Sequence, residues 1–157
     1  MPKTDPGPLA FRMPAVGASS DVLGQVADKW FAPSNPDDHD PVRWAQNRLG
    51  VHLWSKQEEL MTAVRDNRRV AVKSKHGIGK SYSAGLLACW WIDTHPPGTA
   101  MVISTAPSYK QVHAVLWEEI RKHNRVKLNG VKVLPGSVNL SDEWKIDDVL
   151  VGMGRKP

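Results

Sequence analysis

The sequence contains little of what disulfide-rich, metal-binding or membrane-spanning proteins need. Cys89 is its single cysteine, which excludes an internal disulfide and a zinc site built from several cysteines. The mean hydropathy is −0.40, and no apolar run approaches the roughly 20 residues that cross a bilayer. The first residues also lack the continuous apolar stretch of a secretory signal. These absences predict a soluble, cytoplasmic protein with no membrane partner.

Length and charge describe what is present. The 157 residues match one domain by the usual range of about 100–200 residues. The formal net charge is +5. The excess lies after residue 50, where sixteen basic side chains stand against ten acidic ones. A basic surface favours a polyanionic partner, because each neutralised phosphate releases counterions. Solvated lysines and arginines are also common, so charge alone does not identify the partner.

Composition divides the chain into three parts. Residues 1–20 are rich in Pro, Gly and Ser, which predicts a flexible arm. Residues 21–50 are predicted to form a helical lead-in, with one short helix from Asp21 and a second over Pro41–Leu49. Residues 51–157 carry the remaining periodic patterns, and we expect them to form one α/β unit.

Strands and helices alternate after residue 50. A capping-box pair, Ser55 and Glu58, predicts a helix that Ser55 caps and that runs to about Asn67. Two apolar, β-branched runs predict buried strands, the second covered on both faces. This alternation predicts an α/β fold with a parallel central sheet. The expected strands are Val70–Val72 and Ala100–Ser104, and the expected further helices are Lys80–Asp93 and Pro107 to about Lys122.

The pattern after residue 127 is weaker. Three stretches alternate between apolar and polar residues as strands do, with Pro135-Gly136 as the turn between the first two. We therefore predict additional strands over Val131–Leu134, Ser137–Leu140 and Trp144–Val151.

The strongest functional signal is segment 74–81, which reads Ser74-Lys75-His76-Gly77-Ile78-Gly79-Lys80-Ser81. Its glycines allow backbone N–H groups to approach phosphate oxygens, and the following helix adds its dipole. Lys80 would neutralise the β- and γ-phosphates of a nucleotide, and the Ser81 hydroxyl would ligate Mg²⁺. The alternative is a plain glycine turn, although a lysine at a helix start opposes the dipole unless an anion is present. The pattern departs from the usual phosphate loop at Ser74, where a glycine is expected.

Residues outside the loop are candidates with two interpretations each. The amide of Gln57 offers a donor and an acceptor to an adenine edge, or it is a surface side chain. Trp54 packs beside the base or belongs to the core. Ser104-Thr105-Ala106-Pro107 ends a strand where α/β sheets bind ligands, or it merely caps the next helix.

An ATPase of this class also needs an acidic pair at the end of another strand. Asp93 follows an apolar run, but that run lies on the helix after Lys80, so Asp93 is excluded. Asp147 and Asp148 precede their apolar run rather than follow it. We expect Cys89 to be a buried, inert thiol and favour surface positions for His113 and His123, because the histidines lack metal-ligand spacing.

Three segments in order resemble the large subunit of tailed-phage terminases, the DNA-packaging motors of these viruses. They are Leu53-Trp54-Ser55-Lys56-Gln57, the run from Val70 to Ser81, and Ser104-Thr105-Ala106-Pro107 with Gln111. The resemblance covers roughly residues 50–125. In that family an N-terminal ATPase domain related to helicase motors drives DNA into a procapsid. A C-terminal RNase H-like domain cuts the DNA.

The resemblance implies the three-layer sandwich of P-loop NTPases, with a parallel central sheet, here incomplete. It implies ATP and Mg²⁺ as cofactors, and double-stranded DNA, the terminase small subunit and the portal protein as partners. A phage-encoded chain would act in the host cytoplasm. Lys80 would be catalytic, Ser81 the Mg²⁺ ligand and Gln57 the reader of adenine, while Thr105-Ala106-Pro107 would couple the nucleotide site to DNA. The implied nucleotide-binding set is Trp54, Gln57, Ser74, Lys75, His76, Gly77, Ile78, Gly79, Lys80 and Ser81.

Parts of the family pattern have no counterpart. Lys75 and His76 lie where family members often carry an arginine in the loop. The acidic pair and the nuclease domain are also missing. We therefore expect residues 51–157 to be an ATPase domain cut before its acidic motif, able to bind nucleotide and poorly active alone. Two other functions stay open: another truncated helicase-like P-loop ATPase, or a non-catalytic basic module for DNA binding or assembly.

Overall fold

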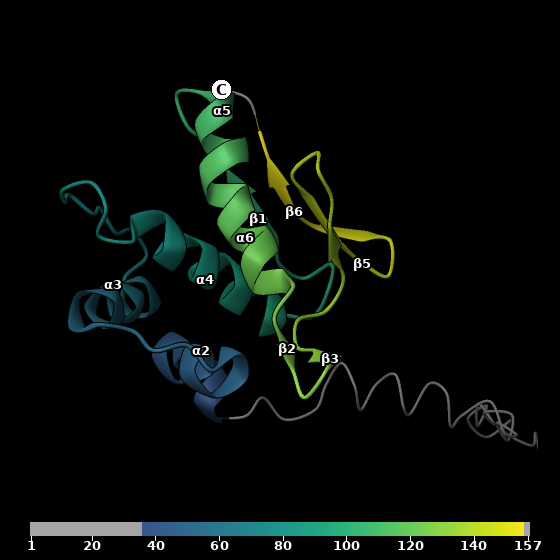
Figure 1. Cartoon of the computed structure of the whole chain (residues 1–157), viewed down its shortest axis with the longest axis horizontal. Coiled ribbons are helices and arrows are strands. Elements are labelled where there is room, and N and C mark those ends of the chain that lie inside the picture. Colours follow the sequence, from purple (N-terminus) through teal and green to yellow (C-terminus); the bar gives the residue numbers. More distant parts are fainter. Residues whose placement is uncertain (1–35, 156–157) are drawn as a thin grey trace, which may run out of the picture. The chain divides into compact units, whose positions relative to one another are not determined.

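The computed structural model describes residues 36–155, so the predicted arm over residues 1–20 and the predicted helix from Asp21 lie outside the described residues. Within 36–155 the fold is mixed α/β, with helices packed on a mixed sheet (Figure 1). The helical elements are η1 (Pro36–His39), α2 (Pro41–Leu49), α3 (Ser55–Asp66), α4 (Lys80–Asp93), α5 (Tyr109–Gln111), the π-helical segment η2 (Val112–Leu116) and α6 (Trp117–Asn124).

Helix α2 confirms the predicted bounds, because its caps are local. The Asp40 carboxylate accepts a hydrogen bond from the Val42 N–H at 2.9 Å, and Gly50 ends the helix with φ of 65°. Trp44 is buried, and its indole N–H donates to Asp93 at the end of α4 at 2.9 Å. Arg48 also donates to Asp93, at 3.0 Å. Asp93 therefore ties α2 to α4.

Helix α3 begins one residue earlier than a Ser55 cap predicts. The N-cap is Trp54, and Ser55 is the first helical residue. The Trp54 N–H donates to the side-chain oxygen of Gln57 at 3.3 Å, so Gln57 fills the position that the sequence pattern assigns to Glu58. This shift of one residue gives Gln57 a role at the start of α3.

Helix α4 confirms the prediction for Lys80–Asp93. The next helix starts at Tyr109 rather than Pro107, and its α-helical path is interrupted by the π-turn η2 before it continues as α6. Helices α4 and α6 cross closely at Gly85, where an added Cβ would lie 3.1 Å from the Glu119 Cβ. Cys89 is buried inside α4, as expected, and burial raises the pKa of its thiol.

The main sheet has the strand order β1-β6-β5-β4. Strand β1 is parallel to β6, with Val102 paired to Gly152, whereas β6–β5 and β5–β4 are antiparallel. The predicted parallel sheet is therefore wrong beyond the β1–β6 pair. The strands are β1 (Val102–Ser104), β4 (Ser137–Val138), β5 (Glu143–Ile146) and β6 (Val149–Gly154).

The predicted strand Val70–Val72 is wrong. The chain from 67 to 75 has neither helix nor strand, and Val72 is 47% exposed. A strand needs a hydrogen-bonded neighbour, and the ladders of the described residues pair other segments. The local β-branched pattern was therefore not sufficient to make a strand here.

The prediction that the second strand, Ala100–Ser104, is buried on both faces is also wrong. In β1 the Ser104 side chain is buried and accepts a hydrogen bond from the Trp117 indole N–H at 2.7 Å. Ile103, which points to the opposite face, is 63% exposed. The helices therefore cover only one face of β1.

After residue 125 the chain forms three successive antiparallel pairs, β2–β3, β4–β5 and β5–β6. Strands β2 (Lys127–Leu128) and β3 (Val131–Lys132) form a separate two-stranded ribbon after α6 (Figure 1). The stretch predicted as one strand, Trp144–Val151, is instead the β5–β6 hairpin, because Asp147 and Asp148 turn the chain with φ of 46° and 66°.

A buried polar cluster joins α6 to the sheet. The Arg121 guanidinium donates to the Asp142 carboxylate at 2.9 Å, and both side chains are buried. His113 contacts the same carboxylate at 2.9 Å and is partly exposed. His123 is buried, so its predicted surface position is wrong. Its ring packs edge-on against Tyr82 with 4.8 Å between the ring centroids.

Candidate phosphate-binding site

The glycines of segment 74–81 shape the turn into α4. Gly77 and Gly79 have φ of 82° and 85°, in the left-handed region that favours glycine. Gly79 is the N-cap of α4. A Cβ on Gly79 would also lie 2.8 Å from the side-chain nitrogen of Gln57. The backbone conformation therefore favours glycine at this position, whereas an added Cβ would only displace the end of the Gln57 side chain.

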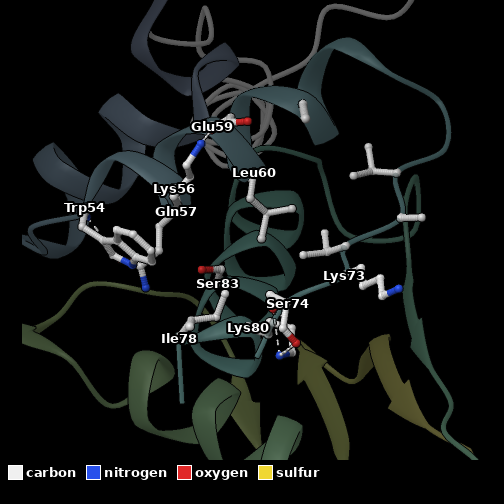
Figure 2. A pocket seen from close by; sticks show the side chains of 14 residues that line it. Trp54, Lys56, Gln57, Glu59, Leu60, Lys73, Ser74, Ile78, Lys80 and Ser83 are labelled. Atoms are coloured by element: carbon white, nitrogen blue, oxygen red, sulfur yellow. Dashed lines mark hydrogen bonds and ion pairs between the residues drawn. The ribbon is translucent and has the colours of Figure 1, made fainter. Parts of the chain in front are cut away.

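Lys80 folds back over the start of the loop. Its ammonium donates to the Ser74 carbonyl oxygen at 3.1 Å and to the Ser74 hydroxyl at 2.9 Å (Figure 2). It also donates to the Lys75 carbonyl oxygen at 2.6 Å. The lysine thus closes the turn with hydrogen bonds to neutral acceptors. A phosphate oxygen would offer the same ammonium a charged and stronger partner.

Gln57 and Trp54 lie beside this loop. The Gln57 oxygen is held by the Trp54 N–H, and its amide nitrogen is directed at Gly79. Gln57 is half-buried, so it is not the plain surface side chain of the alternative interpretation. Trp54 is 45% exposed, which makes the core interpretation of Trp54 wrong.

One cavity of about 370 Å³ lies between the Trp54–Gln57 pair and the glycine loop before α4. Its lining contains Trp54, Gln57, Ser74, Ile78 and Lys80 of the predicted set (Figure 2). The other predicted residues do not line it, although they belong to the same loop and helix start: Lys75, His76, Gly77, Gly79 and Ser81. The structure therefore brings the predicted base-reading residues and part of the predicted phosphate loop around one space.

Sequence reasoning missed part of this lining. Ser83 lies one turn after Lys80 on α4 and is 1% exposed. Within residues 36–155 its hydroxyl has no hydrogen-bond partner. Leu60 and Ala63 follow Gln57 on the same face of α3 and give the cavity an apolar wall. Helical spacing from Lys80 and Gln57 was the signal that could have found all three.

The candidate ligand segment at the end of β1 lies outside this cavity. The Ser104 hydroxyl accepts a hydrogen bond from the Trp117 indole N–H, and Ser104 is not part of the cavity lining.

Among the described residues no group of three or more His, Cys, Asp or Glu side chains is placed to hold a metal ion. None of the helices within residues 36–155 combines the length and the apolar character that crossing a bilayer requires.

Comparisons of the chain with protein-family models, with curated proteins and with solved structures found no match.

Proposed function

We propose that this chain binds ATP with Mg²⁺ through the loop Ser74–Ser81, as the N-terminal ATPase part of a terminase-like DNA-packaging motor. The P-loop sandwich fold, double-stranded DNA, the small subunit and the portal protein belong to the same proposal. They rest on the resemblance of the three sequence motifs.

The observation that carries the proposal is the turn closed by Lys80. Two glycines in left-handed conformation lead directly into a 14-residue helix, and the lysine ammonium lies over the start of the loop. A plain turn would place a lysine at the positive end of the helix dipole with no anion to offset it. Bound phosphates would accept hydrogen bonds from the loop N–H groups and from Lys80.

The residues also fit the rest of a nucleotide. The exposed Trp54 ring offers a face for stacking a base, and the Gln57 amide next to Gly79 offers hydrogen bonds to its edge. Ser81, in the first turn of α4, has the hydroxyl oxygen that Mg²⁺ accepts as a ligand. When bound, Mg²⁺ would neutralise phosphate charge, while Lys80 and the loop would hold the phosphates in place.

Replacing Lys80 tests the proposal. We expect Lys80→Ala to weaken binding of MgATP by at least about tenfold, because it removes a charge-assisted hydrogen bond of roughly 1.5–3 kcal/mol. Isothermal titration calorimetry of the full chain measures this. Lys110→Ala is the matched control, because Lys110 is exposed and does not line the cavity.

Equal affinity of Lys80→Ala and the parent chain for MgATP would contradict the proposal. So would equal losses in Lys80→Ala and Lys110→Ala, because general attraction of ATP by positive charge would then explain the binding.

A further inference from the structure

The ribbon β2–β3 carries an unusual pair of like charges. Lys127 and Lys132 are directly opposite each other in the antiparallel register, and Leu128 is opposite Val131. Successive residues of a strand point to opposite faces, so the two lysines share one face and the two apolar side chains share the other. Like charges directly opposite destabilise a strand pair. The ribbon therefore forms against a repulsion that a bound anion would relieve.

Local geometry accounts for the ribbon despite this repulsion. Asn129 and Gly130 have φ of 51° and 80°, as a two-residue turn of type I′ requires, and this turn matches the twist of the two strands. The Val133 N–H extends the ladder by donating to the Val126 carbonyl oxygen at 3.2 Å. The turn thus holds both lysines on one rigid ribbon.

No carboxylate neutralises the ribbon from within. Residues 120–141 contain five lysines and arginines and no acidic residue. Lys127 has no ion-pair or side-chain hydrogen-bond partner among residues 36–155, and the Lys132 ammonium donates only to the Gly136 carbonyl oxygen there. Burial lowers the pKa of Lys132. By contrast, the exposed Lys122 on α6 is already paired with Glu119 at 2.8 Å.

The far face of the ribbon is exposed as well. Val131 is 70% exposed, and Leu128 beside it is also exposed. The ribbon is therefore accessible on its lysine face and on its apolar face, with its tip directed away from the end of α6 (Figure 1).

We propose that the β2–β3 ribbon is a contact surface for the phosphate backbone of duplex DNA, with Lys127 and Lys132 as the contacting residues. A two-stranded ribbon has the width that the major groove of B-DNA admits. Duplex DNA carries one charge per about 1.7 Å of its axis. An extended acidic polypeptide offers at most one charge per roughly 3.3–3.6 Å, so DNA compensates the paired lysines better. This inference rests on the proposed function for its partner, duplex DNA, and adds the surface that contacts it, which requires no nucleotide.

The test is a titration of a fluorescently labelled 20-base-pair duplex with the full chain, without nucleotide, followed by anisotropy over a series of salt concentrations. We expect Lys127→Ala with Lys132→Ala to weaken binding at about 0.1 M salt by at least tenfold. The same double variant should reduce the slope of log K against log salt by about 2, as the loss of two phosphate contacts predicts. Lys127→Arg with Lys132→Arg should retain the parent affinity.

The matched control is Lys110→Ala with Lys122→Ala, which removes the same charge from α5 and α6. An equal loss in this control overturns the proposal, because net charge alone would then determine binding. Failure of the parent chain to bind the duplex at low salt also overturns it. Competition by poly-glutamate as effective as by DNA at equal charge overturns it in favour of an acidic protein partner. Lys80→Ala should bind DNA with an affinity within about twofold of the parent. The DNA-binding result is then independent of whether the loop binds nucleotide.

Discussion

Individual side chains decide how the loop before α4 is built. Gly79 has a left-handed φ of 85° and lies next to the Gln57 amide, and Gln57 is itself held by the backbone of Trp54. Lys80 then closes the other side of the turn. A single glutamine therefore couples the start of α3 to the start of α4, which places a hydrogen-bonding amide next to the loop.

His123 gives the protein a pH-dependent stability. It is buried next to Tyr82, its Nε2 has no partner within residues 36–155, and burial lowers its pKa below the ordinary 6.5. The unfolded chain therefore binds this proton more readily than the folded one. The contribution of His123 is complete above about pH 6.5 and is lost as the pH falls toward the folded-state pKa.

We expect the free energy of unfolding in urea to fall between pH 7.5 and 5.5, by at most about 1.4 kcal/mol per pH unit for this proton. His123→Phe, which keeps the ring contact but cannot titrate, should show a smaller slope. His52→Gln, at an exposed position, should keep the slope of the parent chain. The same pH slope in His123→Phe as in the parent would contradict this assignment.

At the scale of elements, the approach of α4 to α6 depends on Gly85. A Cβ there would lie 3.1 Å from the Glu119 Cβ and 3.2 Å from the His123 ring. Both neighbours belong to α6, so relief requires the two helices to move apart. The glycine therefore sets how closely these helices pack, although glycine within a helix costs about 1 kcal/mol relative to alanine.

We expect Gly85→Val to lower the free energy of unfolding by about 1–3 kcal/mol, because it overpacks the helix contact. Ala84→Val is the matched control, since Ala84 is an exposed neighbour on the same helix and receives the same β-branched side chain. Urea unfolding of both variants separates packing from helix propensity. Helix propensity alone would make Gly85→Val slightly stabilising and Ala84→Val slightly destabilising, so a Gly85→Val variant as stable as the parent chain would contradict the overpacking.

The bounds of a helix or strand can be predicted from the sequence when the residues that set them are close in the chain. The bounds of α2 and α4 are predictable because a carboxylate cap and glycines lie next to them in the chain. Val70–Val72 has the composition of a strand, but a strand also needs a second strand to pair with, and the neighbouring residues do not show whether one is present. The β2–β3 turn was predictable from Asn129-Gly130, a strong hairpin signal that the strand pattern alone overlooks.

At the scale of the whole molecule, the Arg121–Asp142 pair connects helix α6 with the turn that leads into β5. Burying two charges is costly, and their mutual attraction offsets that cost only while both are present. His113 and Glu118 add contacts from the partly exposed side. Sequence analysis could not find this pair, because arginine and aspartate are rarely buried. Likewise, the contact of Gln57 with Gly79 depends on how α3 packs against α4.

We expect Asp142→Asn to lower the free energy of unfolding by about 3 kcal/mol, because it leaves the buried Arg121 guanidinium without its buried charged partner. Asparagine tolerates the left-handed φ of 59° at this position, so backbone strain does not contribute. Chemical denaturation measures the change. Glu118→Gln removes the exposed partner of the same arginine and should cost less than about 1 kcal/mol. A loss for Asp142→Asn no larger than that would show that the buried pair is dispensable.

The parallel pairing of β1 with β6 has a consequence for synthesis on the ribosome. The pairing joins Val102 to Gly152. About 50 further residues must therefore be synthesised after β1 before β6, its only partner in the described sheet, is present. At translation rates of about 5–20 residues per second, that interval lasts roughly 3–10 seconds. During this time Ile103 and both edges of β1 are accessible to other nascent chains. The interval ends only when β6 has left the exit tunnel, so a chaperone that shields β1 would act before that point.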